Sequence, residues 1–296
     1  MTSKAAFALL VVITTGLMGS SFAIGKIGLS YVSPLLLVGI RFTLAGLLMI
    51  AIVTALRRPH PKQFSDWLQI FWIGTFQTAG VMGAIFLSLR TITAGESAIL
   101  TFMNPLLVVV FGTLALGIRY RFIQWTGVLL GFIGVVITMG GELQLEIGTL
   151  FGFISAVFWA IATLLIKSWG NRFDIWVLTA YQMLFGGILL LLGSAFLEDM
   201  KLVLNPTSVS IIIWLAVMAS IVQFAIWFYL LQNGNPGKVS AFLFLAPFFG
   251  VISGWGLLGE QLGFTLLIGG MLIFLGIFLV NWPEKPAKEP AIDPLH

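Results

Sequence analysis

The chain has 296 residues, of which 59% are hydrophobic and only 9% are charged, against about 25% charged residues in ordinary soluble domains. So few charges cannot cover a water-soluble fold of this size, and the mean hydropathy of +1.08 agrees. The composition excludes a soluble domain, and the formal charge of +4 is interpreted as a signal of membrane topology rather than of a nucleic-acid partner.

Ten apolar runs are each long enough to cross about 30 Å of hydrocarbon as a helix. In chain order they cover residues 5–25, 34–56, 67–88, 94–116, 122–140, 147–166, 175–197, 209–231, 238–258 and 262–282. The first run resembles a signal peptide that ends at Ser21-Phe22-Ala23, but its length favours a retained helix. The sequence therefore predicts an all-α integral membrane protein with ten transmembrane helices.

The residue types that the chain lacks exclude much chemistry. There is no cysteine, hence no disulfide and no thiolate metal site. The only histidines are His60, in a basic loop, and His296, the last residue, so zinc sites and Ser-His catalysis are excluded as well. We expect no metal, no cofactor and no enzymatic activity.

The basic residues give the chain an orientation. With a cytoplasmic N-terminus, three of them lie outside (Lys26, Arg90 and Lys201) and Arg41 lies within a span. The other eleven then lie inside: Lys4, Arg57, Arg58, Lys62, Arg119, Arg121, Lys167, Arg172, Lys238, Lys285 and Lys288. This bias predicts that both termini are cytoplasmic, and residues 283–296 are expected to form a disordered cytoplasmic tail.

The chain matches itself at an offset of 142 residues, from Ile70–Gly134 onto Ile212–Gly276, with 16 identities in 65 positions. The identities include one proline pair, Pro105/Pro247, and five glycine pairs. A weaker match at an offset of 141 pairs Lys26 with Lys167, Arg41 with Gln182 and Gly46 with Gly187. Because each repeat would hold five helices, an odd number, the second should enter the membrane from the opposite side. The predicted domains are residues 1–143 and the inverted repeat 144–282, an arrangement typical of alternating-access transporters.

With these features the chain resembles the EamA branch of the drug/metabolite transporter superfamily. The resemblance rests on Gly19-Ser20-Ser21-Phe22 with Lys26, on Ile40-Arg41-Phe42, on Pro105, and on Leu258-Gly259-Glu260 followed by Gly269-Gly270. Within the family it is most similar to a bacterial exporter of aromatic amino acids. Met18 stands where the family often has Trp, and Ile118 stands where the second repeat has Glu260. The resemblance implies export of small metabolites across the bacterial inner membrane.

Proline and polar residues inside the spans are the candidates for the substrate path. Pro105 and Pro247 have no N–H, so the carbonyls of Thr101 and Leu243 lose their hydrogen-bond donors within the helix. Within a membrane such carbonyls are tolerated only where they face protein or a cavity. Asn104 has the amide chemistry to bind an ammonium or a carboxylate group, whereas its repeat partner is Ala246. The alternatives are packing kinks and an interhelical hydrogen bond.

Further candidates are polar or aromatic residues deep in the remaining spans. The polar ones are Ser20, Ser21, Gln77, Thr163 and Gln223, and the aromatic ones, which have the shape to stack on a substrate, are Trp159, Trp227 and Phe244. Close helix packing explains the small residues equally well. Arg41 is the one intramembrane cation. One interpretation is that its side chain snorkels outward to water, and the other is that it gates the path or binds a carboxylate.

The sequence thus predicts an exporter of small zwitterionic metabolites, most of all amino acids including aromatic ones, with a central cavity that opens alternately to each side. Its expected partners are the small-molecule substrate and the lipid bilayer, and no oligomer is required. No acidic residue lies at the middle of a span, which disfavours proton coupling and export of cationic drugs. A channel or sensor without a transport cycle, or a multidrug exporter, remains the alternative.

Overall fold

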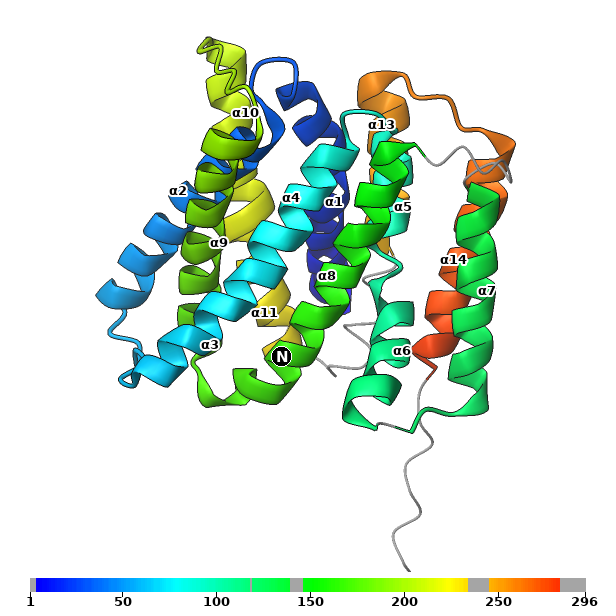
Figure 1. Cartoon of the computed structure of the whole chain (residues 1–296), viewed down its shortest axis with the longest axis horizontal. Coiled ribbons are helices and arrows are strands. Elements are labelled where there is room, and N and C mark those ends of the chain that lie inside the picture. Colours follow the sequence, from blue (N-terminus) through cyan, green and yellow to red (C-terminus); the bar gives the residue numbers. More distant parts are fainter. Residues whose placement is uncertain (1–3, 118, 139–145, 234–244, 283–296) are drawn as a thin grey trace, which may run out of the picture.

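The computed structural model describes residues 4–117, 119–138, 146–233 and 245–282, and its regular elements there are helices (Figure 1). The helices before residue 140 are α1 (Lys4–Gly28), α2 (Pro34–Ala55), α3 (Phe64–Gly74), η1 (Thr75–Gly80), α4 (Val81–Ser88), α5 (Ala94–Thr101), α6 (Asn104–Leu116) and α7 (Phe122–Thr138). After residue 146 they are α8 (Ile147–Trp169), η2 (Gly170–Arg172), α9 (Ile175–Leu197), α10 (Pro206–Ala216), η3 (Val217–Val222), α11 (Gln223–Asn233), α13 (Leu245–Leu258) and α14 (Phe264–Val280). The tail 283–296 lies outside the described residues, as do Leu243 and Phe244.

Seven helical segments of the described chain are long and apolar enough to cross a membrane. Three further apolar helices, α7, α13 and α14, have 17, 14 and 17 residues there. The all-helical membrane fold is therefore confirmed, while the number of ten spans stays a prediction.

The backbone repeats the same local features 142 residues apart. The segment α3–η1–α4 is one continuous helix interrupted by the π-helical turn η1, and α10–η3–α11 is interrupted in the same way by η3. η1 begins at Thr75 and η3 begins at Val217, which is the offset of the sequence repeat. Gly117 and Gly259, which the same offset pairs, both end a helix with positive φ angles of 63° and 66°. Glycine is favoured there because it has no side chain to clash.

The contacts between helices also come in matched pairs. α2 packs on α9 and α7 packs on α14, so each of these pairs joins two equivalent helices. α1 packs on α13 and α11, and α8 packs correspondingly on their equivalents α6 and α4. α1 ends where Lys26 reaches the carbonyl of Ile92, and α8 begins where Gly148 lies against Ser88 and Thr91. One helix therefore ends on the face of the molecule where its equivalent begins, and Figure 1 shows the two running in opposite directions.

The ends of the helices lie on two faces of the molecule. The terminal face is the one at which α1 begins and α14 ends, and the opposite face is the one at which α1 ends and α2 begins (Figure 1).

The expected proline kink at Pro105 is a full break of the helix. α5 ends at Thr101, Phe102 and Met103 form a turn, and α6 starts at Asn104 with Pro105 in its first turn. Proline is well suited to a first turn because its missing N–H would have no partner in the helix there. Pro247 likewise lies in the first turn of α13, whose start at Leu245 borders the undescribed residues 234–244.

Glycines bring the central helices into backbone contact. A Cβ atom built on Gly187 in α9 would lie 2.5 Å from the backbone nitrogen of Thr43 in α2. One built on Gly46 in α2 would lie 2.6 Å from the backbone nitrogen of Leu184. Such close approach maximises van der Waals packing, which drives helix association where no hydrophobic effect acts between helices.

We predict that Gly187→Ala destabilises the protein by roughly 1–3 kcal/mol, because the added methyl group forces α2 and α9 apart. Gly16→Ala is the matched control, since a Cβ atom at Gly16 has no described atom within 4 Å. The measurement is the thermal unfolding midpoint of the purified protein in detergent. Equal midpoints for the two variants would contradict the close packing of these helices.

Candidate functional site

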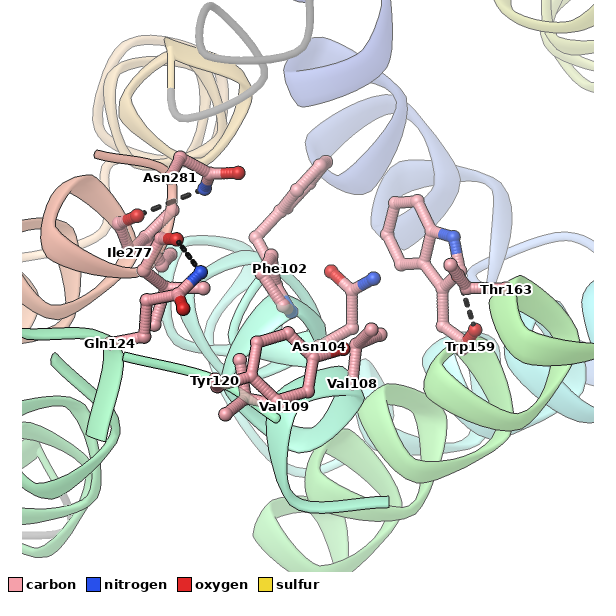
Figure 2. Close-up of a pocket in the computed structure, with 12 residues that line it drawn as sticks. Phe102, Asn104, Val108, Val109, Tyr120, Gln124, Trp159, Thr163, Ile277 and Asn281 are labelled. Carbon is pink, nitrogen blue, oxygen red and sulfur yellow. Dashed lines mark hydrogen bonds between the residues drawn. The ribbon is translucent and has the colours of Figure 1, made fainter. Parts of the chain in front are cut away.

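The larger of two adjoining cavities, here called the wide cavity, has a volume of about 360 Å³ and extends from the break between α5 and α6 toward the terminal face. Its lining residues come from α5–α6, α7, α8 and α14: Phe102, Asn104, Pro105, Val108, Val109, Tyr120, Gln124, Trp159, Thr163, Ile277, Val280 and Asn281. In Figure 2 the amide of Asn104 lies between the rings of Phe102 and Trp159. The wide cavity is thus mostly apolar, with a few amide and hydroxyl groups, which is typical of small-molecule sites.

A smaller cavity of about 40 Å³, here called the deep cavity, lies among α1, α2, α4, α8 and α11. Its lining residues are Met18, Ser21, Phe22, Arg41, Met82, Ile85, Phe86, Phe102, Trp159 and Gln223. This volume has room for a small polar group and is much smaller than that of the wide cavity.

Phe102 and Trp159 line both cavities. Their ring centroids lie 5.2 Å apart at an interplanar angle of 62°, and Phe102 also lies 6.1 Å from the ring of Phe22. The two rings therefore form a neck between the wide and deep cavities. Phe102 is the first residue of the turn 102–103 that separates α5 from α6.

The structure brings seven of the predicted site residues to these cavities. Asn104, Pro105 and Thr163 line the wide cavity, Ser21, Arg41 and Gln223 line the deep one, and Trp159 lines both. Asn104 is 9% exposed and lines the wide cavity.

Five predicted residues lie elsewhere. The hydroxyl group of Thr101 is buried against Ser155 at 2.7 Å, where α5 packs on α8. Trp227 packs with Val11 and Leu230 between α1 and α11. Ser20, Gln77 and Pro247 line neither the wide nor the deep cavity.

Arg41 is buried in the deep cavity at 3% exposure, so it does not snorkel toward water. Its Nε donates to the hydroxyl group of Ser220 at 3.0 Å, and its Nη2 donates to the carbonyl of Ala219 at 2.8 Å. Both acceptors belong to the π-helical turn η3, whose unusual hydrogen bonding is common at functional positions. None of the ion pairs in the described part of the chain involves Arg41.

Several residues of the wide cavity could not be selected from the sequence. Tyr120 follows α6 and lies against Gly112, and burial raises the pKa of its phenol, which is therefore protonated at neutral pH. Gln124 donates to the carbonyl of Val280 at 3.1 Å and so joins α7 to the end of α14. Polar residues next to helix ends are ordinary in membrane proteins, and only the contact between α7 and α14 brings these toward the cavity.

The opposite face is closed by an ion pair that also caps a helix. Glu260 accepts from Lys26 Nζ at 3.1 Å and from the backbone nitrogens of Ala94 and Gly95 at 2.7 and 3.3 Å, at the start of α5. Lys26 donates in addition to the carbonyl of Ile92 at 2.7 Å. A carboxylate at a helix N-terminus satisfies free N–H groups and interacts favourably with the helix dipole.

The same face is tied at a second place. Ser33 donates to the carbonyl of Lys201 at 3.0 Å, and Val203 donates to the carbonyl of Tyr31 at 2.9 Å. Glu198 accepts from the backbone nitrogens of Leu35 and Leu36 at the start of α2. Each repeat is therefore bound to the other at the opposite face, whereas the wide cavity reaches the terminal face.

We predict that Glu260→Gln loosens this closure, because the neutral amide weakens both the pairing with Lys26 and the cap of α5. In a background carrying Ile85→Cys, an impermeant thiol reagent applied to the face that bears Glu260 should label the deep cavity several-fold faster. The native chain has no cysteine, so labelling reports on position 85 alone. Asp199→Asn, an exposed acid after α9, is the control, and equal rates in both variants would show that Glu260 does not hold the face closed.

Comparison with known proteins identifies this architecture. The sequence profile of the EamA-like transporter family matches the chain twice, over residues 5–140 and 146–282. The chain is 29% identical to the uncharacterized transporter YvbV of Bacillus subtilis, over 98% of this chain and 96% of that protein. It is 27% identical to the uncharacterized inner membrane transporter YedA of Escherichia coli, over 93% of this chain and 92% of that protein.

A solved crystal structure has the same fold, with a TM-score of 0.64 at 22% sequence identity over 94% of this chain and 98% of that one. The relatives are named as transporters, which fits the expectation of a protein that is not an enzyme. With profile matches over nearly all of its length, this multi-pass membrane protein belongs to the EamA-like transporter family, within the drug/metabolite transporter superfamily.

Proposed function

We propose that this transporter exports small zwitterionic metabolites, most of all amino acids including aromatic ones, by alternating access between two inverted five-helix repeats. The observation that carries the proposal is the pair of cavities between the repeats, with an amide, a guanidinium and two aromatic rings around them. Asn104 has an oxygen that accepts from an ammonium group, and Trp159 and Phe102 offer ring faces to an apolar side chain. The resemblance to a bacterial exporter of aromatic amino acids supports the same substrate class.

The direction of transport follows from the orientation in the membrane. The excess of basic residues in the loops that adjoin the terminal face favours a cytoplasmic location for that face and for both termini. The wide cavity then opens to the cytoplasm, while the pairing of Lys26 with Glu260 closes the exterior. A substrate loaded from the cytoplasm in this state and released after the opposite face opens is exported.

The cavities disfavour a cationic multidrug exporter. No acidic residue is among the described residues that line the wide or the deep cavity, and the one charge there is the cation Arg41. A cationic substrate would need a buried carboxylate as its partner. A channel without a transport cycle is the remaining alternative, and counterflow separates the two.

The proposal is tested by uptake of labelled phenylalanine into liposomes that contain the purified protein. With equal pH on both sides we expect the label to equilibrate, because neither cavity offers an acidic proton-coupling group. Unlabelled phenylalanine inside the liposomes should accelerate the uptake, since a carrier exchanges substrates across one site. Uptake that requires an imposed pH gradient would refute uncoupled transport, and uptake without acceleration would favour the channel.

Two substitutions should affect the substrates differently. Asn104→Ala should weaken transport of all amino acids alike, by roughly 1–2 kcal/mol for one lost hydrogen bond. Trp159→Ala should reduce transport of phenylalanine and tryptophan more than that of alanine, because the ring face that borders both cavities is lost. Trp227→Ala is the control, since it removes the same side chain outside both cavities. The measurement is uptake of each amino acid at matched protein amounts, and equal losses for all substrates in Trp159→Ala would contradict its contact with the side chain.

The orientation has a direct test in intact cells. Single cysteines introduced by Lys4→Cys and by Lys288→Cys should stay unlabelled by an impermeant reagent until the cells are permeabilised, because both positions are cytoplasmic in the proposed topology. Arg90→Cys, on the opposite face, should be labelled at once and serves as the positive control. Labelling of either terminal cysteine in intact cells would reverse the assignment and with it the direction of transport.

A further inference from the structure

Arg41 carries a charge that the scaffold does not need. Its α2 position corresponds to Gln182 in α9 at the offset of 141. Its acceptor Ser220 in η3 corresponds to Thr78 in η1 at the offset of 142. Thr78 donates to the side-chain oxygen of Gln182 at 2.6 Å, just as Arg41 donates to Ser220 at 3.0 Å. The same contact between a helix and a π-helical turn is therefore made twice, once by a neutral amide and once by a cation.

No described anion pairs with Arg41, whose guanidinium carbon lies 4.6 Å from the centre of the Phe42 ring. The guanidinium is 3% exposed, and its two bonded acceptors are a hydroxyl group and a backbone carbonyl, neither of which is charged. None of the described residues that line the deep cavity is acidic. Burying a cation is expensive without an anionic partner, and an arginine stays charged even when buried.

We infer that Arg41 binds the carboxylate group of the transported substrate in the deep cavity. This deepens the proposed function and rests on it for the substrate class, since an amino acid supplies the anion that the site lacks. The guanidinium has five N–H donors, of which Nε and Nη2 each use one in the contacts with η3, so donors remain for a carboxylate. The repeat-related position supplies no such charge, because Gln182 is neutral and is occupied by Thr78.

The sizes of the two cavities fit this division of the substrate. The deep cavity, at about 40 Å³, has room for a carboxylate-sized group, and the wide cavity, at about 360 Å³, has room for an aromatic side chain. Phe102 and Trp159 line both and so flank the part of the substrate that joins the two groups. Recognition by Arg41 therefore selects for a carboxylate and against amines that have the same ring.

The test compares three probes that share a phenyl ring: phenylalanine, 3-phenylpropionate and 2-phenylethylamine. Thermal stabilisation of the purified protein in detergent is measured against probe concentration for the native chain and for Arg41→Gln. We expect both carboxylates to stabilise the native protein and the amine to leave it unchanged. In Arg41→Gln the concentration of carboxylate for half-maximal stabilisation should rise at least about tenfold, since hydrogen bonds to charged groups commonly contribute this much.

Arg41→Gln copies the amide of Gln182, so we expect it to retain the hydrogen bond to Ser220 and to fold. Arg90→Gln, which removes an exposed arginine after α4, is the matched control for the loss of one positive charge. Arg41→Lys is the second variant, because it keeps the charge and loses the planar fork that pairs with both carboxylate oxygens. It should weaken the binding of both carboxylates and leave the response to the amine unchanged.

The inference is overturned if folded Arg41→Gln responds to the carboxylates as the native protein does, or if the amine stabilises the native protein equally. It is also overturned if neither carboxylate stabilises the native protein, or if chloride at matched ionic strength does so as strongly as 3-phenylpropionate. Phenylalanine uptake into liposomes distinguishes a failure of the Arg41 carboxylate site from a failure of the proposed function. If Arg41→Gln still takes up phenylalanine, the protein transports amino acids without this residue. If 3-phenylpropionate stabilises the protein in an Arg41-dependent way but no amino acid is taken up, the carboxylate site is retained and the proposed substrate is refuted.

Discussion

Every backbone polar group inside the hydrocarbon must find its partner within the protein, and this constraint governs where the helices of this chain are irregular. The turn at 102–103 adjoins both cavities, and the π-helical turns η1 and η3 pack on neighbouring helices through the buried side chains of Thr78 and Ser220. Irregular backbone inside a membrane is tolerated only where protein or a cavity surrounds it. The wide and deep cavities therefore adjoin the broken helix α5–α6 and the π-helical turn η3.

The helices are held together by two chemically different kinds of contact. Helices that associate without a hydrophobic driving force depend on close contact, which Gly46 and Gly187 permit between α2 and α9. In the proposed transport cycle the opposite face has to open, so the contacts that hold it closed have to be separable. The contacts of Glu260 with Lys26 and with the start of α5 are polar, directional and separable in water, in contrast to the glycine contacts. The rigid and the mobile parts of a transport cycle would thus differ in the chemistry that holds them.

The sequence predicted most of the fold because a membrane simplifies the problem. Length and hydropathy locate helices, and the offset of 142 residues paired Gly117 with Gly259, which both end a helix in the structure. The π-helical turns themselves were not predicted, because no residue type in Thr75–Gly80 distinguishes them from a regular helix. The break at Phe102 was predicted only as a kink, since proline marks the place of an interruption but not how many residues leave the helix.

The candidate site was less predictable, because a polar residue within a helix has no visible direction in the sequence. Asn104 and Thr101 lie one helical turn apart around the same break, yet Asn104 borders the wide cavity while Thr101 is buried against Ser155. Trp159 and Trp227 were equivalent in depth, but only Trp159 lies at the neck between the cavities. Which face of each helix meets the cavity is decided by the packing of helices far apart in the chain.

The comparison of equivalent positions provides the information that a single position lacks. Where a repeated scaffold makes a polar contact twice, a difference between the two equivalent residues separates what the fold requires from what it does not. Thr78 with Gln182 shows that a neutral pair is sufficient to join α9 to η1. The guanidinium of Arg41 exceeds that requirement by one positive charge, and a buried charge that the fold does not need is retained at a cost to stability. The asymmetry of the site therefore fits the proposed substrate, an amino acid, which has an anionic group at one end and an apolar side chain at the other.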